Sequence, residues 1–168
     1  MMTKAAKLEE RLADDVLAER ATSGSAAAFA QLVERHGDAV YAIATNLCRS
    51  LDDAERTVQD AFLTAWRDFG FFPAGARFTT WLYRIATRIA LADGARGRRR
   101  RDEQADITAP LRGVLDCMDD RTRAAFVLCD LVELCTEETA VILDLPPPTV
   151  RREAHRARLL LRAFIDRL

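Results

Sequence analysis

Apolar residues recur every three or four positions along much of this chain, which is the spacing of one face of an α-helix. The clearest run spans residues 26–47 and follows Ser25, a residue type that often caps a helix. Its expected inward stripe is Phe29, Leu32, Val33, Val40, Ile43, Ala44 and Leu47. Upstream, Asp14 or Asp15 is expected to cap a short helix that ends at a polar break over residues 22–25.

Two more helices are predicted further along, on either side of a loop at residues 70–77. Asp52 is expected to begin the first of them, with Glu55 at the distance of a reciprocal capping pair. Of the apolar residues that follow at helical spacing, Phe62 and Trp66 are expected in the core. The second helix is predicted over residues 78–96.

In the helix at 78–96 the predicted inward positions are Trp81 or Leu82, Ile85, Ile89 and Ala90. The remaining faces then carry Thr79, Thr80, Tyr83, Thr87 and Arg88. A run of arginines, residues 98–101, follows. Aromatic rings beside arginines suit separated nucleic-acid strands, because bases stack on the rings and arginines bind phosphates. Core aromatics beside a solvated helix end explain the same residues equally well.

Residues 102–109 are acidic and lack periodicity, which predicts a linker. Beyond it, helices are expected at 111–117, 121–131 and 136–143. After a turn at 144–146 comes a last helix, which reaches residue 162 or beyond. Its inward stripe is Val150, Ala154, Ala157 and Leu161.

The last two predicted helices match a helix-turn-helix, in which a short helix and a tight turn precede a basic recognition helix. Pro147 and Pro148 suit the first turn of that helix, where a missing N–H does no harm. Any amphipathic helical hairpin gives a similar pattern, so a solvated charged helix is the alternative. His155 fits a contact to phosphate or to a base edge better than a metal ligand, since it has no partner.

Composition supports a folded, mostly helical protein, because 49% of the 168 residues are hydrophobic and only 7 are Gly and 5 are Pro. The predicted fold class is all-α, with two small helical domains joined by a short acidic linker. The expected organisation is a flexible lead-in at 1–12, a first domain at 13–101, the linker at 102–109 and a second domain at 110–168.

The net charge of −1 conceals a strong segregation of charge. Residues 77–101 contain eight arginines against the single acid Asp93, and residues 102–120 contain six acids against Arg112. From residue 145 onward the chain is basic again. Two basic patches separated by an acidic joint predict two contacts with a polyanion.

Other kinds of chemistry have little support in the sequence. The four cysteines form no CxxC pair and His36 and His155 are the only histidines, so neither a metal nor another cofactor is expected. Buried reduced thiols are the simplest interpretation of the cysteines. No nucleophile–base arrangement or phosphate-binding glycine loop indicates an enzyme. No apolar run is long enough for a membrane span and the polar N-terminus does not resemble a signal peptide, so a cytoplasmic protein is expected.

From about residue 16 to residue 161, the chain resembles a bacterial extracytoplasmic-function (ECF) sigma factor, a two-domain specificity subunit of RNA polymerase. The resemblance rests on blocks in a fixed order at 53–66, 78–86, 98–101, 120–128, 137–140 and 149–158. Each block is loose alone, but their order and spacing together are specific. The resemblance implies sigma domain 2 in the first half and sigma domain 4, with its helix-turn-helix, in the second.

The resemblance also implies partners and site residues. The expected partners are core polymerase, through the clamp helices of its largest subunit and its flap, promoter DNA and an anti-sigma factor. The expected polymerase contacts are Asp53, Glu55, Gln59, Asp60 and Leu63. Those to the −10 element, which the loop at 71–77 would help to melt, are Phe78, Thr79, Trp81, Tyr83, Arg84, Thr87, Arg88 and Arg96. Those to the −35 element are Thr149, Arg151, Arg152, His155, Arg156 and Arg158.

Several positions depart from the family pattern. Arg56 stands where a second acid is usual, Arg88 where Asn is common, and Cys135 where a Ser caps a helix, although Thr136 could serve as that cap. Asp144 replaces a turn Gly at a position where Asp tolerates left-handed geometry. Because the linker is short, part of 109–117 is expected to unwind in the polymerase complex, or the two domains to lie unusually close.

Two other functions are compatible with the sequence. A sigma-like decoy would bind an anti-sigma protein without touching DNA, but it would not need the arginines at 98–101 and 151–158. A general helix-turn-helix repressor would leave the acidic face at 53–60 and the aromatic loop without a purpose.

Overall fold

The computed structural model describes residues 4–73, 75–96 and 109–167. Most of these residues are helical and none of them forms a strand, which confirms the all-α prediction. The elements are α1 (Lys4–Thr22), α2 (Ala26–Leu47), α3 (Leu51–Asp68), the 3-10 turn η1 (Phe69–Phe71), α4 (Phe78–Arg96), α5 (Ala109–Asp116), α6 (Asp120–Phe126), the π-helical turn η3 (Val127–Leu131), α7 (Thr136–Leu143) and α8 (Pro147–Ile165). Arg98–Arg101 and the predicted linker lie outside the described residues, apart from Ala109, which begins α5.

Two of the predicted helix starts on the N-terminal side are wrong. α1 begins at Lys4, so Asp14 lies in mid-helix, where its buried side chain faces α2 and caps nothing. α3 is capped by Ser50, whose Oγ accepts the Asp53 N–H at 3.1 Å and donates to Asp53 Oδ2 at 2.7 Å. The predicted Asp52–Glu55 capping pair is therefore replaced by one two residues earlier. The cap predicted at Ser25 is confirmed, because its Oγ accepts the Ala28 N–H at 3.3 Å.

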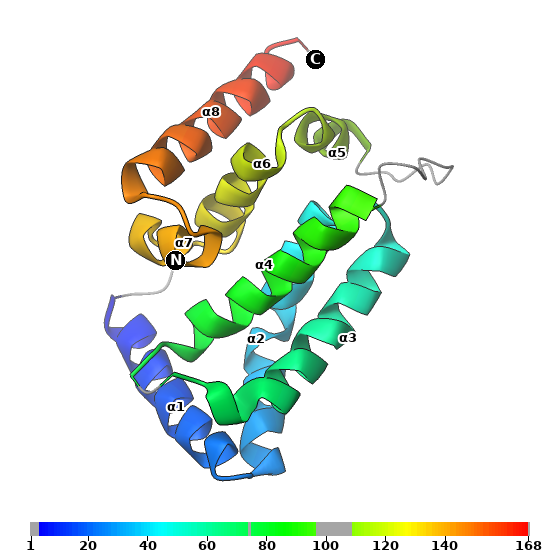
Figure 1. Cartoon of the computed structure of the whole chain (residues 1–168). Coiled ribbons are helices and arrows are strands. Elements are labelled where there is room, and N and C mark those ends of the chain that lie inside the picture. Colours follow the sequence, from blue (N-terminus) through cyan, green and yellow to red (C-terminus); the bar gives the residue numbers. More distant parts are fainter. Residues whose placement is uncertain (1–3, 74, 97–108, 168) are drawn as a thin grey trace.

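Helices α2, α3 and α4 lie side by side, with α1 packed against α2 (Figure 1). The stripe predicted on α2 is confirmed at Leu32, Val40, Ile43, Ala44 and Leu47, all with no exposed surface. On α3 the inward residues are small instead: Ala54, Thr57, Ala61 and Ala65. They allow close helix packing and displace the large rings to the edge.

Trp66 is the clearest consequence of that displacement, because 41% of its surface is exposed, whereas the sequence predicted it in the core. Its ring packs against Phe29 with centroids 4.9 Å apart. Phe62 is half-buried beside it. Phe69, at the end of α3, is buried.

The C-terminal unit contains the predicted helix-turn-helix, formed by α7 and α8. α7 is capped by Cys135, whose Sγ accepts the Glu138 N–H at 3.4 Å while the Glu138 carboxylate accepts the Cys135 N–H. The thiol thus does the work of the missing serine, and Thr136 is not the cap. Asp144 adopts left-handed geometry (φ 55°, ψ 47°) as expected, and α8 begins at Pro147.

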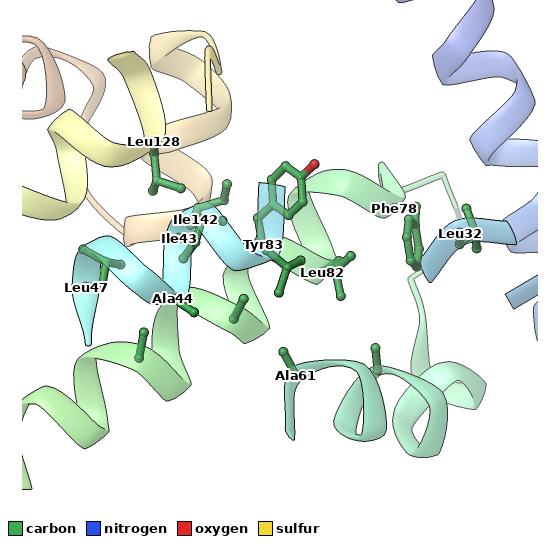
Figure 2. Packing of buried hydrophobic residues seen from close by; sticks show 14 of the residues in the cluster. Leu32, Ile43, Ala44, Leu47, Ala61, Phe78, Leu82, Tyr83, Leu128 and Ile142 are labelled. Atoms are coloured by element: carbon green, nitrogen blue, oxygen red, sulfur yellow. The ribbon is translucent and has the colours of Figure 1, made fainter. Parts of the chain in front are cut away.

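One buried apolar cluster spans both units, and the C-terminal unit has a second cluster of its own around Met118 and Phe126. Leu128 and Ile142 of the C-terminal unit lie in the same buried cluster as Ile43 and Leu47 of α2 (Figure 2). At the rim of this contact, Arg77 forms an ion pair with Glu138 of α7. The first helix of the helix-turn-helix is therefore held directly against α4, and η3 and α6 lie against α2.

Candidate nucleic-acid interface

Three of the predicted −10 residues on α4 are buried and their side chains face the core. Phe78, Tyr83 and Thr87 are 1%, 5% and 1% exposed, so their predicted direct contacts with DNA do not fit this structure. The prediction placed Tyr83 and Thr87 on outer faces because it assumed one narrow inward stripe. α4 instead packs against α2, α3 and α7, which widens its buried surface beyond a single stripe.

Tyr83 belongs to a buried polar network that joins three helices. Its hydroxyl shares a hydrogen bond with His36 Nδ1 at 3.1 Å, and His36 Nε2 shares one with Asp14 Oδ2 at 3.0 Å. Arg35 Nη1 donates to Asp14 Oδ1 at 3.1 Å. Burial acts to raise the pKa of the Asp14 carboxyl, but the hydrogen bond and charge of His36, together with Arg35, hold that pKa below its ordinary value of 3.8. The network fixes α4 to α1 and α2.

The accessible part of α4 retains the other predicted residues. Arg88 is exposed, and Thr79, Trp81 and Arg84 are half-buried. Arg96 is the last residue of α4, and its side chain lies outside the described residues. These residues share the helix with the buried ones, so their backbone is fixed by the core.

An aromatic cluster supports the loop that precedes α4. Trp81 packs edge-on against Phe69 and Phe72, with ring centroids 5.4 and 5.2 Å away. In contrast, the ring of Phe71 is 85% exposed at the start of this loop. The sequence predicted a role for the loop but did not name Phe71 as a site residue, because spacing alone does not distinguish it from the packed Phe72.

The acidic face of α3 is presented to solvent as predicted. Glu55, Gln59 and Asp60 are exposed, and Leu63 is 65% exposed. Leu63 and Trp66 line a shallow apolar groove of about 310 Å³ between α2 and α3, together with Ala26, Phe29 and Phe62. The polar residues near the start of α3 thus continue into an apolar patch further along the same helix.

Asp53 is engaged within α3, unlike the exposed Glu55 and Asp60. Its carboxylate accepts the Ser50 hydroxyl and forms an ion pair with Arg56, the residue that departs from the family pattern. Part of its negative charge is therefore compensated within α3.

The recognition helix α8 presents all of its predicted polar residues outside the core. Arg151, Arg152, His155, Arg156 and Arg158 are exposed and Thr149 is half-buried, whereas Val150, Ala154 and Ala157 are buried as predicted. The stripe and the basic face predicted for this helix are confirmed. Leu161, the fourth predicted inward residue, is partly buried against the C-terminal core.

Each exposed arginine of α8 from 151 to 158 is paired with an acid of the same unit. Arg151 Nη2 lies 3.4 Å from Glu137 Oε1, and Arg156 Nη1 lies 3.2 Å from Asp119 Oδ2. Arg152 binds Glu153, and Arg158 binds both oxygens of Asp130 at 2.8 and 3.1 Å. These ion pairs differ in strength: Arg158 and Arg152 each donate two hydrogen bonds to a carboxylate, whereas Arg151 makes one contact of 3.4 Å.

Asp119 also caps α6 through the backbone N–H of Thr122 at 2.9 Å. That hydrogen bond is the main reason why the pKa of the Asp119 carboxyl lies below its ordinary value, and it outweighs the opposing effect of burial. The hydrogen bond that Arg158 donates to the Asp130 carboxylate raises the pKa of the Arg158 guanidinium.

Comparison with known proteins places both halves of the chain. The family model for Sigma-70 region 2 matches residues 32–101, and the one for Sigma-70, region 4 matches residues 109–161. The ECF RNA polymerase sigma-E factor of Escherichia coli (strain K12) is 31% identical, over 90% of this chain and 93% of its own length. This chain belongs to the ECF sigma factors of RNA polymerase.

The two matched regions of this sigma factor meet between α4 and α5. Region 2 matches from within α2 to beyond α4, and region 4 matches α5 to within α8. The ECF RNA polymerase sigma factor SigE of Mycolicibacterium smegmatis is 32% identical over 80% of this chain, which spans 60% of that relative's length. The structure of CnrH in complex with the cytosolic domain of CnrY is similar, with a TM-score of 0.79, 33% identity and coverage of 92% of this chain and 97% of that chain.

The residues that the structure describes include no helix that is both long enough and apolar enough to cross a membrane. They also contain no group of three or more His, Cys, Asp or Glu side chains that could hold a metal ion.

Proposed function

We propose that this ECF sigma factor binds core polymerase through the exposed face of α3 and directs it to promoters through α4 and α8. The observation that carries the proposal is the recognition helix, which follows a tight turn and exposes four arginines and His155 between residues 151 and 158. Arginine in the major groove can pair bidentately with guanine, and the N-terminal part of such a helix reaches the bases. This is the geometry that reading a −35 element requires.

For the −10 element, we assign direct contacts to Thr79, Trp81, Arg84 and Arg88, together with Arg96. The buried Phe78, Tyr83 and Thr87 instead fix the position of α4. Separating DNA strands costs stacking energy, which aromatic surfaces and phosphate contacts can partly offset. The exposed ring of Phe71 adds one such surface at the loop.

Polymerase binding is proposed for Glu55, Gln59, Asp60 and Leu63, which share the exposed side of α3. Along α3, acidic and polar side chains are followed by an apolar one, which fits a helical partner with basic and then apolar side chains in the matching order. Asp53 contributes less than the other acids, because Arg56 already neutralises part of its charge. Control by an anti-sigma factor and a cytoplasmic location are also proposed for this chain, because both are usual for the family. A structural relative, CnrH, has been solved in complex with the cytosolic domain of CnrY.

The proposal is tested by run-off transcription with core polymerase on a library of genomic promoters. Specific initiation is expected, and Arg152→Ala should weaken promoters that depend on their −35 element. Trp81→Ala should instead impair open-complex formation. An equal loss of both properties in both variants would indicate misfolding. Absence of specific initiation, together with tight binding to an anti-sigma protein, would favour the decoy function.

A further inference from the structure

α8 carries a single acid, Glu153, on the helix that we assign to duplex DNA. The residue is 8% exposed, and the helix around it is basic. A carboxylate near a phosphate backbone opposes binding electrostatically. An acid at the centre of a DNA-reading helix therefore calls for a positive role, which its contacts supply.

Both oxygens of Glu153 are engaged. Oε1 accepts from Nε and Nη2 of Arg152 at 3.2 and 3.0 Å. Oε2 accepts from the Thr122 hydroxyl of α6 at 3.1 Å, and Arg156 Nη1 lies 3.9 Å away. The fully buried Thr122 shares its single hydroxyl proton between Glu153 Oε2 and the capping Asp119 Oδ2, which ties the Glu153 carboxylate to the start of α6. The guanidinium bound to it is fixed in turn.

We propose that Glu153 is a positioning residue that sets the base preference of α8 by presenting Arg152 to a guanine of the −35 duplex. The inference rests on the proposed function. Arg152 uses its Nε–Nη2 edge for Glu153, which leaves Nη1 and the second hydrogen of Nη2 as a free pair of donors. Two parallel donors are what the O6 and N7 acceptors of guanine require.

The pairing also determines what Arg152 does not bind. A solvated arginine on a DNA-facing helix can turn to a phosphate, a contact that carries no sequence information. Held by a carboxylate that phosphates repel, the guanidinium is directed to a base edge instead. Lysine could not replace it, because an ammonium group lacks the rigid fork that serves two partners at once.

Glu137 provides a matched control within the same helix-turn-helix. It also pairs with an arginine of α8, Arg151, but through one contact of 3.4 Å between two exposed side chains. Such a pair holds its arginine only loosely and contributes little. Neutralising Glu137 removes the same charge from the same unit without disturbing Arg152.

The test uses holoenzyme formed from core polymerase and the full chain, on promoters in which the −35 window is randomised. Transcripts are sequenced to obtain the base preference at each position for the wild type and for Glu153→Gln, Arg152→Ala, Arg152→Lys and Glu137→Gln. The wild type is expected to prefer guanine about tenfold at one position. The first three variants should reduce that preference to about twofold or less at this position, and Glu137→Gln should retain it.

The inference is overturned if Glu153→Gln keeps the guanine preference that Arg152→Ala abolishes, or if Glu153→Gln weakens every position alike. It is equally overturned if Arg152→Ala changes no position. Should Glu153→Gln fail to fold, as judged by its melting temperature, Arg152→Lys decides, since residue 152 is at the surface; retained preference in that variant overturns the inference. A wild type without base preference anywhere in the window would contradict the proposed function instead.

Discussion

At the scale of single residues, the network of Asp14, His36 and Tyr83 shows how a polar side chain that suggests DNA contact can serve the core. The three side chains come from α1, α2 and α4 and are joined by hydrogen bonds of 3.0 and 3.1 Å. Nothing local in the sequence distinguishes a buried Tyr83 from an exposed one, because its partner His36 is 47 positions away. The periodicity of apolar residues along a helix cannot predict such a long-range contact.

Tyr83→Phe should lower the free energy of unfolding by about 1–2 kcal/mol, because His36 Nδ1 would be left buried without its partner. Urea denaturation of the full chain measures this change. Tyr41→Phe is the matched control, because Tyr41 is exposed on α2. The free energy of unfolding of this variant should stay within about 0.5 kcal/mol of the wild-type value. A large loss of promoter opening by folded Tyr83→Phe, at unchanged stability, would restore Tyr83 to the DNA interface.

Asp14 makes stability depend on pH in the acid range. Its folded pKa lies below 3.8, so its charge stabilises the fold above the unfolded value, and this contribution is lost as the pH falls through the folded pKa. Asp14→Asn should therefore be less stable at neutral pH and lose less stability on acidification between about pH 5 and pH 2. Urea unfolding across that range measures both effects. The exposed neighbour Asp15 provides the control, and an identical pH profile for Asp14→Asn and wild type would contradict the prediction.

At the scale of helices, the predicted bounds hold for α4 and α7 but not for the start of α3. α4 and α7 span residues 78–96 and 136–143 as predicted, and the sequence has Pro73 and Gly75 before α4 and Asp144 and Pro146 after α7. At α3, both Ser50 and Asp52 are good caps, and Ser50 is the cap because Asp53 completes its reciprocal pair. The inward face of α3 was misjudged for a related reason: large rings dominate the pattern, but small residues allow the closest packing.

The cap of α7 offers a direct test of a thiol in a serine's place. Cys135→Ser should retain the contact with the Glu138 N–H and raise stability by about 0.5 kcal/mol, because a hydroxyl is a stronger acceptor than a thiol. Cys135→Ala should lose about 1 kcal/mol, since that N–H then has no side-chain acceptor. Thermal unfolding measures both changes. Equal stability of the serine and alanine variants would show that the cap contributes nothing.

At the scale of the whole molecule, the unpredicted feature is the shared core of the two sigma regions. In the sequence, Leu128 and Ile142 look like ordinary inward positions of the second unit. Ile43 looks like an ordinary inward position of the first unit. A periodic pattern specifies that a residue is buried but not which element covers it. The sequence therefore predicted two helical units joined by a short linker, and only the structure shows α7 packed on α4 (Figure 1).

This contact matters for function, because α4 and α7–α8 are assigned to two separate promoter elements. While α7 remains packed on α4, the two DNA-reading surfaces keep one fixed relation. The ion pair between Arg77 and Glu138 at its rim is partly exposed, and such pairs contribute at most about 1 kcal/mol. Most of the cohesion must come from the buried apolar residues, which makes a single core position the sharpest probe.

Ile142→Asp should separate the two units, because an unpaired carboxylate in the shared core costs several kcal/mol, which separation relieves by exposing it to water. Small-angle scattering should show a radius of gyration clearly above the ~15 Å of a compact chain of this length. Circular dichroism should show that the helices persist. Val141→Asp places the same charge one residue away, at a side chain that is 54% exposed, and should leave the radius unchanged. An unchanged radius in Ile142→Asp would mean that the contact between the units survives a buried charge, and a loss of helicity would mean that the C-terminal unit cannot fold without this core.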